Sequence, residues 1–508
     1  MTEIEKTNEP HEFSAALTEI LGRSLSDFET LHGIERLSGG ASQETYCLTV
    51  TAGGLTRKLA MRRAAGGGLY GAQPVDRPET YPGLAAEAAL MQAAGAAGVP
   101  EPEVFHVLAE EEGLGEGFIM QWLEGEALGA RIARSPDFAD LREHLAYDCG
   151  RVLARIHAID LDATGLRSLL SPISAAEFVE QTWARYREFD TPQPMIDYTG
   201  RWLLDHLPAT NRQVLVHNDF RNGNIMVDAD GLVAVLDWEI AHIGDPMRDL
   251  GWICTNSWRF GVGDKAVGGF GHRADLFRGY EEESGLTIDP EQVKFWEVFG
   301  SFWWAVGCIG MAQQYRIGPD RTVERPGIGR RSSECQVDCV NLLIPGIAPL
   351  LVPELVGADN AQSLPQSLPR SPQDFRMPRS DELLLSVRDF LRNDLMQATE
   401  GRTQFLARVA SNSLDIVERE LRVGNALHDL ELTHLQGLGI GNSDADLAAR
   451  RWALVNGLRD GSVSLANTAL QSYLRETVVN EVAIDQPKYS GLAQALRNHD
   501  HFAKAAGE

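Results

Sequence analysis

Residues 217–239 read His217-Asn218-Asp219-Phe220-Arg221-Asn222-Gly223-Asn224, Ile225-Met226-Val227, Asp228-Ala229-Asp230-Gly231, Leu232-Val233-Ala234-Val235-Leu236 and Asp237-Trp238-Glu239. Two apolar runs flank a turn rich in aspartate and glycine, and this order is typical of a β-hairpin. A hairpin that begins after Asn224 returns the chain to the same place at Asp237. The stretch therefore predicts that the polar loop and the second acidic cluster lie side by side.

The residue types in this stretch suit phosphoryl transfer. Transfer of a γ-phosphoryl group to a hydroxyl needs a carboxylate that orients the acceptor oxygen and takes its proton, and oxygen ligands that hold Mg²⁺. Asp219 is the candidate base, and Asn224 and Asp237 are the candidate metal ligands. Magnesium favours near-octahedral oxygen coordination with one or two carboxylates, which this set provides. Glu239 is either a ligand for a second metal or a water, or a plain surface residue.

Two further residues of the loop have expected roles. Arg221 follows Asp219 by two positions, where a cation can balance charge on the transferring group. His217 is expected to brace the loop by hydrogen bonds, because the position of the base belongs to Asp219. Asp249, in the following Gly244-Asp245-Pro246-Met247-Arg248-Asp249-Leu250, is expected to fix the loop from behind.

Taken together, the loop, the hairpin and the second acidic cluster resemble the aminoglycoside-phosphotransferase-like family of small-molecule kinases. These are relatives of the protein kinases, and their loop pattern is His-Gly-Asp-x-x-x-x-Asn, so Asn218 stands where the family has glycine. The resemblance implies ATP and Mg²⁺ as cofactors. It also implies an α+β, two-lobed protein-kinase-like fold, with a small β-rich N-lobe over 12–122 and a helical C-lobe over 123–351.

The expected N-lobe contains candidates for nucleotide binding. Gly39, Gly40 and Ser42 lie in a turn between two strand-like runs, where backbone amides can approach phosphates. Lys58 and Arg62 share one face of the next predicted strand. The resemblance aligns Arg62 with the family's nucleotide lysine, although Lys58 stays an alternative.

Two other elements complete the expected nucleotide site. Glu87, the only acid in an alanine-rich helix predicted over 81–97, is the candidate ion-pair partner of that cation, unless it is a solvated surface residue. An apolar strand ends at Met120, Gln121 and Trp122, where the resemblance implies a hinge that offers backbone groups to adenine.

The end of the chain has a different texture. Residues 352–379 are rich in Pro, Ser and Gln and predict a linker. Residues 380–508 have the apolar periodicity of an all-helical domain, and this tail resembles an uncharacterised helical module that accompanies such kinases in bacteria. A docking or regulatory role and simple packing against the kinase lobe are both open for it.

Composition limits the partners. The 508 residues carry a net charge of −26, which argues against nucleic acid or an anionic membrane as the main partner. The six cysteines lack framework spacing, and the first ten residues lack the basic and apolar regions of a secretion signal, so we expect a cytoplasmic location. The longest apolar stretch, 295–311, is interrupted and too short to span a bilayer.

The acceptor is expected to be a small molecule with a hydroxyl group. The chain most resembles the branch of the family associated with acyl-CoA dehydrogenases, which favours a hydroxyacyl-CoA, and the alternative within the class is an aminoglycoside or a choline-like amino alcohol. An anionic acyl-CoA would require a basic patch, for which four arginines are candidates unless they are ordinary surface: Arg321, Arg325, Arg330 and Arg331. Aromatic residues of 162–213 could line the acceptor pocket, with core packing as the default. A non-catalytic nucleotide-binding scaffold is the alternative of another class.

Overall fold

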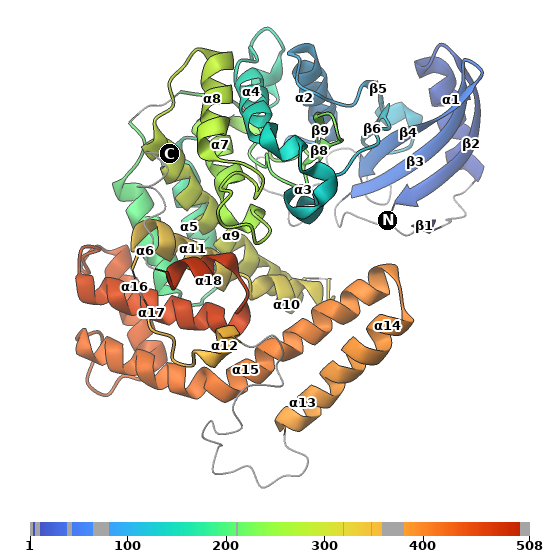
Figure 1. Cartoon of the computed structure of the whole chain (residues 1–508). Coiled ribbons are helices and arrows are strands. Elements are labelled where there is room, and N and C mark those ends of the chain that lie inside the picture. The colour runs from blue at the N-terminus through green and yellow to red at the C-terminus, as the bar shows by residue number, and fades with distance from the viewer. Residues whose placement is uncertain are drawn as a thin grey trace. The chain divides into compact units, whose positions relative to one another are not determined.

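The computed structural model describes residues 4–5, 11–37, 43–64, 81–209, 212–318, 320–346, 348–357 and 380–497. The chain forms two compact units. Unit 1 comprises Met1–Ser174, Thr210–Ile253 and Phe270–Asp289, and unit 2 comprises Ala175–Ala209, Cys254–Gly269 and Pro290–Glu508. Figure 1 labels the helices and strands of both units.

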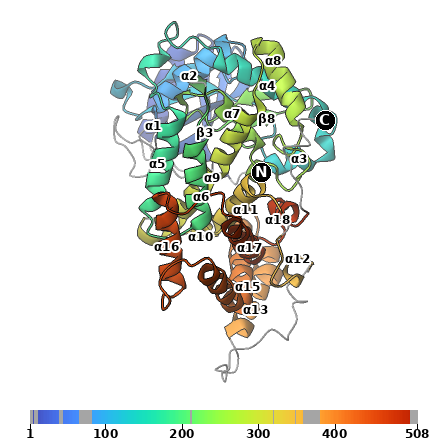
Figure 2. The same cartoon turned by 90° about the vertical axis from the view of Figure 1, so that its left-hand side faces the viewer.

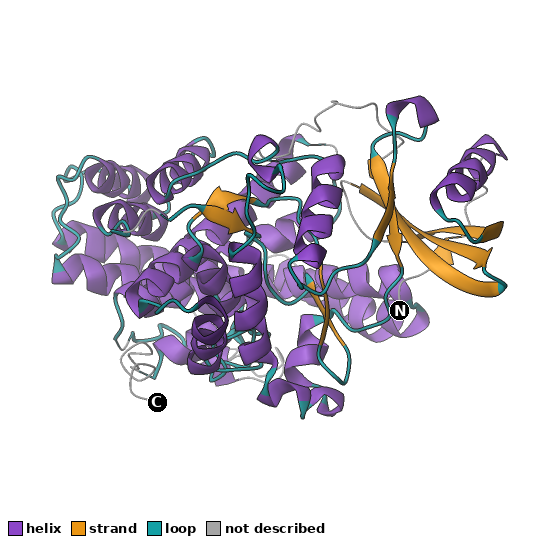
Figure 3. Cartoon of the chain, turned by 90° about the horizontal axis from the view of Figure 1, so that it is seen from above, coloured by secondary structure: helices purple, strands orange, loops and turns teal. Residues whose placement is uncertain are grey.

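Unit 1 begins with an antiparallel sheet in the strand order β1-β2-β3-β4-β6-β5. The strands are β1 (Ile4–Glu5), β2 (Phe28–Leu37), β3 (Gln43–Ala52), β4 (Leu55–Ala64), β5 (Val104–Val107) and β6 (Gly117–Gln121), and Figure 3 draws them in orange. Helix α1 (His11–Ser24) buries Leu17, Ile20 and Leu21 in one core with the sheet. Helix α2 (Leu84–Ala96) begins three residues later than the sequence predicts, and it carries Glu87 in its first turn.

The predicted hairpin is present in unit 1. It consists of β8 (Ile225–Val227) and β9 (Leu232–Val235), which pair antiparallel. The turn is fixed by the Asp228 carboxylate, which accepts hydrogen bonds from the backbone N–H groups of Asp230 (2.8 Å) and Gly231 (3.0 Å). A second antiparallel pair, β7 (Val214–Val216) with β10 (His242–Gly244), encloses the loop and the hairpin in sequence.

Helices complete unit 1. They are α3 (Gly129–Arg134), α4 (Leu145–His157), α7 (Met247–Cys254), whose last residue belongs to unit 2, and α8 (Arg273–Ser284). Helices α4 and α8 approach closely because both contact points are glycines. A Cβ atom on Gly150 would lie 2.1 Å from the Leu276 carbonyl oxygen, and one on Gly279 would lie 2.1 Å from that of Tyr147. The close approach places His157, at the end of α4, beside Tyr280.

Unit 2 is helical in its described parts. Its α-helices are α5 (Ala175–Arg187), α6 (Pro194–Asp205), α9 (Pro290–Ile317), α10 (Glu324–Gly329), α11 (Ser332–Leu343), α12 (Glu354–Gly357), α13 (Ser380–Asp389), α14 (Met396–Ala398), α15 (Gly401–Gly437), α16 (Leu447–Arg459), α17 (Thr468–Asp485) and α18 (Ser490–Ala495). A π-helical turn, Phe390–Leu395, joins α13 to α14. Helix α17 packs against both α11 and α15, as Figure 2 shows.

One hydrophobic core in unit 2 joins residues from both sides of the predicted linker. It includes Tyr198 of α6 and Val337 of α11 together with Leu474 and Val482 of α17. Val352 and Leu355, in the first part of the predicted linker, are buried in the same core because their side chains are apolar. The rest of that linker, 358–379, lies outside the described residues.

Across the ranges that the structure describes, no helix combines the length and the apolar character needed to cross a membrane. The six cysteines are free thiols and all are buried.

Candidate active site

The loop that carries the candidate base is held in place by Asp249, whose side chain is fully buried. Its carboxylate accepts hydrogen bonds from the backbone N–H groups of His217 (2.9 Å) and Asn218 (2.7 Å), and it pairs with His157 Nε2 at 3.0 Å. Burial by itself would raise the pKa of Asp249, but the hydrogen bond from His157 and the other contacts offset it, so the pKa lies below its ordinary value. Asp249 is therefore a buried anion that orients the loop, as the sequence predicts.

Asn218 stands where the family pattern has glycine, and the loop accommodates it in two ways. Its backbone has φ 68°, in the left-handed region that glycine adopts most easily and that asparagine tolerates better than most residues. Its side chain gives the loop two further bonds, because Oδ1 accepts from Arg248 Nε (2.9 Å) and Nδ2 donates to the carbonyl of Ile240 (3.2 Å). The substitution keeps the backbone conformation and ties the loop to α7.

His217 is buried and makes contacts with the backbone on both sides of its ring. Its Nε2 bonds the carbonyl of Leu236 (3.1 Å), and its Nδ1 accepts from the backbone N–H of Asp219 (3.2 Å). Burial lowers the pKa of the imidazole, so the neutral form is favoured. This arrangement suits a residue that braces the loop against the end of the hairpin.

The Asp219 carboxylate is fixed by three neighbouring side chains. Arg221 binds it with two bonds, Nε to Oδ1 at 2.8 Å and Nη2 to Oδ2 at 3.0 Å. Trp252 Nε1 donates to Oδ1 (2.8 Å), and Asn224 Nδ2 donates to Oδ2 (2.5 Å). Because these donors hold both oxygens, the carboxylate has one defined orientation. Trp252 acts here through an indole N–H, a role that the sequence does not reveal.

The three candidate metal ligands lie at the start and just after the end of the hairpin. The backbone N–H of Leu236 donates to the Asn224 carbonyl (2.7 Å), which brings Asp237 back beside Asn224 as the hairpin predicts. Asn224 uses its Nδ2 atom for Asp219, so its Oδ1 is the atom that it would offer to a metal. Asp237 has φ 71°, a conformation that costs free energy for a residue with a side chain.

An amide oxygen and two carboxylates are hard oxygen donors, so the chemistry of this set fits Mg²⁺. Burial, and then the charge of Asp237, raise the pKa of Glu239 to about 7. Over the described part of the chain, no three His, Cys, Asp or Glu side chains are gathered as a ready metal cluster.

Arg62 of β4 contacts acids from two other parts of the chain, helix α2 and the end of the hairpin. Its guanidinium is 3.2 Å from Glu87 and 2.7 Å from Asp237, with Glu239 at 3.9 Å, and it also bonds Gln43. The Arg62–Glu87 ion pair that the sequence suggests is present, and Glu87 is buried rather than solvated. Lys58 is exposed, with its Nζ 5.2 Å from the centre of the Trp122 ring.

The other candidate nucleotide-binding residues belong to two segments of the chain. Gly39, Gly40 and Ser42 lie outside the described residues. Met120 and Gln121 end β6, and Trp122 follows it. Gly125, three residues after Trp122, lies beside β8. A Cβ atom added to Gly125 would lie 2.6 Å from Met226 Cγ. The segment after β6 therefore borders the β8–β9 hairpin.

Three of the four arginines of the expected basic patch are paired with carboxylates. Arg325 pairs with Asp320, Arg330 with Asp485 and Glu420, and Arg331 with Glu334. Arg321 bonds the carbonyl of Tyr315. Most of the charge that would attract an acyl-CoA is thus balanced within unit 2.

The aromatic residues of 162–213 follow the default expectation where they are buried. Trp183 Nε1 donates to Asp197 (2.8 Å), and Tyr186 donates to the other oxygen of the same carboxylate (3.0 Å). Arg459 of α16 completes this buried group at 2.7 Å. These side chains pack the interior of unit 2.

Three neighbouring residues have roles that the pattern of the sequence did not indicate: Gln43, Arg248 and Trp252. Each acts on a residue far away in the sequence. Only the resemblance of the segment 244–250 to the family pattern pointed toward this region.

A kinase-like pair of lobes with this loop defines a phosphotransferase. A model of the phosphotransferase enzyme family matches residues 33–286, half of the chain, and the chain belongs to this family. A model for a domain of unknown function (DUF6285) matches residues 397–489. The family supports small-molecule kinase activity.

Curated relatives match the same half of the chain. Acyl-CoA dehydrogenase family member 10 of Mus musculus is 32% identical over 225 residues, which cover 42% of this chain and 19% of that protein. Acyl-CoA dehydrogenase family member 11 of Gallus gallus is 28% identical over 227 residues, which cover 43% of this chain and 27% of that protein. The match thus spans less than a third of either relative's length.

A solved structure has the same fold. The crystal structure of a protein of Ralstonia eutropha that is assigned to the aminoglycoside phosphotransferases matches with a TM-score of 0.51 and 22% identity. The match covers 66% of this chain and 96% of that one. The predicted two-lobed kinase-like fold, followed by an all-α region, is confirmed.

Proposed function

We propose that this chain transfers the γ-phosphoryl group of ATP, in a Mg²⁺-dependent reaction, to a hydroxyl group of a small molecule. The observation that carries the proposal is the convergence of Asp219, Asn224 and Asp237 at the ends of one hairpin. Asp219, with both oxygens oriented, would position the acceptor hydroxyl and take its proton. Asn224, Asp237 and Glu239 would hold the metal, which when bound neutralises phosphate charge.

The cations have complementary roles in this proposal. Arg62 would contact the α- and β-phosphates, with Glu87 keeping its guanidinium in place. In the structure Arg62 also pairs with Asp237, so binding of the nucleotide and the metal would exchange that contact for phosphate oxygens. Arg221 would stabilise the charge of the group in transfer while it orients Asp219.

The proposed acceptor is a hydroxyacyl-CoA. The names of the curated relatives connect proteins with this region to acyl-CoA chemistry, although the match covers only a minor part of them. The paired arginines of unit 2 give no support to an anionic acceptor, so an aminoglycoside or a choline-like amino alcohol stays the alternative. The boundaries 12–122, 123–351, 352–379 and 380–508 also stay a proposal.

The test is transfer of labelled phosphate from ATP to pools of hydroxyacyl-CoAs, amino alcohols and aminoglycosides, with and without Mg²⁺. We expect transfer to one pool that requires the metal and that falls by roughly 10²- to 10⁴-fold in Asp219→Asn. Asp230→Asn, an exposed acid in the turn of the same hairpin, is the matched control and should keep full turnover. Normal turnover in Asp219→Asn would contradict the roles assigned here. Nucleotide binding without any metal-dependent turnover would instead support the scaffold.

A further inference from the structure

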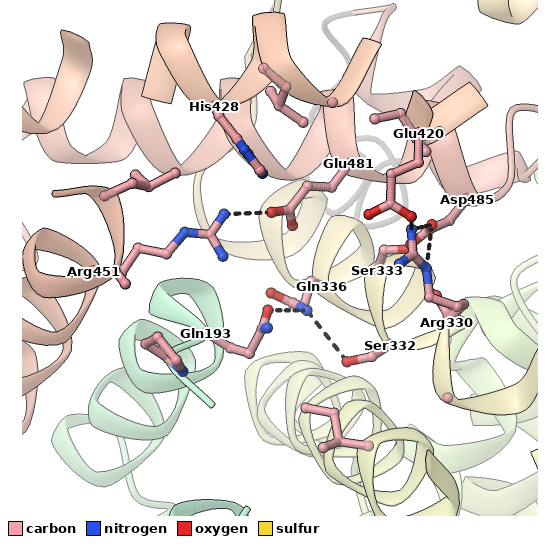
Figure 4. Close-up of a pocket in the computed structure, with 18 of the residues that line it drawn as sticks. Gln193, Arg330, Ser332, Ser333, Gln336, Glu420, His428, Arg451, Glu481 and Asp485 are labelled. Carbon is pink, nitrogen blue, oxygen red and sulfur yellow. Dashed lines mark hydrogen bonds and ion pairs between the residues drawn. The ribbon is translucent and has the colours of Figure 1, made fainter. Parts of the chain in front are cut away.

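Unit 2 contains a cavity of about 660 Å³ that takes no part in the site described above. One wall comes from Gln193 before α6 and from the α10–α11 region, and the other from α15, α16 and α17, as Figure 4 shows. Its volume lies in the range of sites that bind small molecules. The domain of unknown function supplies the second wall, so the cavity exists only where that domain packs on α11.

Two arginines at this cavity are each shared between two carboxylates. On one side Arg451 is 2.6 Å from Glu431 and 2.9 Å from Glu481. A single guanidinium therefore faces two acids, and the group has an excess negative charge if both acids are ionised. Burial raises the pKa of Glu481, which reflects the cost of keeping that charge away from water.

The opposite side of the cavity repeats the arrangement. Arg330 is 2.7 Å from Asp485 and 3.1 Å from Glu420. Burial also raises the pKa of Asp485. The cavity lining contains two arginines, Arg330 and Arg451, and a larger number of acids. These acids are Glu420, Asp446, Glu481 and Asp485, so the lining favours a cation over an anion.

A neutral hydrogen-bond acceptor, the side-chain oxygen of Gln336, lines the same cavity. Gln336 is only 4% exposed, and its Nε2 donates to Gln193 Oε1 and to Ser332 Oγ, both at 3.3 Å. Within the described ranges, no group donates a hydrogen bond to its Oε1. Because Gln336 lines the cavity, its Oε1 can accept an N–H from a ligand there.

The spacing of the acids indicates the shape of the ligand. Glu481 and Asp485 are one turn apart on α17, about 6 Å along the helix axis. Leu427 and Ile484 add apolar surface to the lining. Two ammonium groups joined by a short methylene chain would meet both acids and cover this apolar surface.

We propose that this cavity binds a small aliphatic polyamine, with ammonium groups at Glu481 and Asp485 and an N–H at Gln336 Oε1. The ligand supplies the positive charge that the two shared arginines lack. This inference does not depend on the phosphotransfer reaction, because its test measures binding alone.

The test is titration calorimetry of the full chain with 1,4-diaminobutane and spermidine at physiological salt. We expect saturable binding of one ligand, with 1,4-butanediol and succinate inactive. Glu481→Gln and Asp485→Asn should each weaken binding by at least about tenfold, since each removes one ion-pair partner. Both variants should fold, because Arg451 keeps Glu431 and Arg330 keeps Glu420.

The matched control is Asp429→Asn, which removes the same charge from an exposed position of α15 outside the cavity lining. It should bind the polyamines as the parent protein does. Equal weakening in Asp429→Asn and Glu481→Gln would mean general attraction to an acidic surface and would overturn the proposal. Absence of saturable binding, or preference for succinate, would overturn it as well.

Discussion

Replacement of Asp249 by asparagine tests whether the loop of the candidate base depends on one buried carboxylate. In the parent protein the two oxygens accept from the backbone N–H groups of His217 and Asn218 and pair with His157. An asparagine has one oxygen, so its NH₂ group would face the N–H of His217 or of Asn218. One backbone donor would then be buried without an acceptor, and the other bonds would lose their charge assistance.

The size of the effect follows from these contacts. A hydrogen bond to a charged group contributes about 1.5–3 kcal/mol, and a buried donor left without a partner costs about 1–3 kcal/mol. We therefore expect Asp249→Asn to lower the free energy of unfolding by roughly 3–5 kcal/mol. Phosphoryl transfer should also fall, because Asp219 loses the backbone support of its loop.

The matched control is Asp228→Asn in the hairpin turn. Asp228 also accepts from two backbone N–H groups, at 2.8 and 3.0 Å, but it is exposed, so water can replace the lost acceptor. We expect a change below about 1 kcal/mol there. Urea unfolding measures both variants, and hydrogen exchange of the peptide that contains residues 217 and 218 reports the loop directly. Unchanged stability and unchanged exchange in Asp249→Asn would refute the role assigned to this carboxylate.

Substitutions at three further positions, Asn218, Asp338 and Gly150, test other contacts of the structure. Asn218→Ala should be about 1 kcal/mol less stable than Asn218→Gly, because both lose the side-chain bonds and only alanine is strained at φ 68°; thermal unfolding compares them. Burial raises the pKa of Asp338 from 3.8 to about 7, so its protonated form stabilises the fold at low pH and this contribution is lost as the pH rises through 7. Relative to the parent, Asp338→Asn should therefore gain roughly 3–4 kcal/mol between pH 4 and pH 8, measured by urea unfolding at both values. Gly150→Ala should cost about 1–3 kcal/mol by overpacking against Leu276, whereas Gly22→Ala, whose nearest contact is 3.8 Å, should not destabilise the chain in the same assay.

The hairpin and its neighbours were predictable because the signals are local. The turn Asp228–Gly231 and the apolar runs on either side predict the pairing of β8 with β9, and this pairing brings Asp237 back to Asn224. The loop contacts of Asp249 could be anticipated only from the resemblance to the family pattern. No property of residues 244–250 alone states which backbone groups that carboxylate will bind.

For a physical reason, the sequence could not state which of the two cations, Arg62 or Lys58, meets the acids of the candidate site. Both residues point to the same face of β4, and both carry a positive charge. What separates them is the position of two acids from distant elements, Glu87 of α2 and Asp237 after β9, which meet at Arg62. Contacts of this kind depend on tertiary packing, which periodicity along one strand does not encode.

The packing of the tail, residues 380–508, also depends on tertiary contacts that the sequence does not reveal. The phosphotransferase family match ends at residue 286 and the domain-of-unknown-function match begins at 397, so sequence similarity suggests an enzyme with a separate appendage. The core of unit 2 instead combines Tyr198 and Val337 with Leu474 and Val482, and the buried Arg459–Asp197 ion pair joins α16 to α6. An appendage that shares a core and a buried ion pair with earlier helices cannot leave without exposing both. The described part of the tail therefore shares a core with α6 and α11, and a ligand in the cavity that both line would stabilise this shared packing.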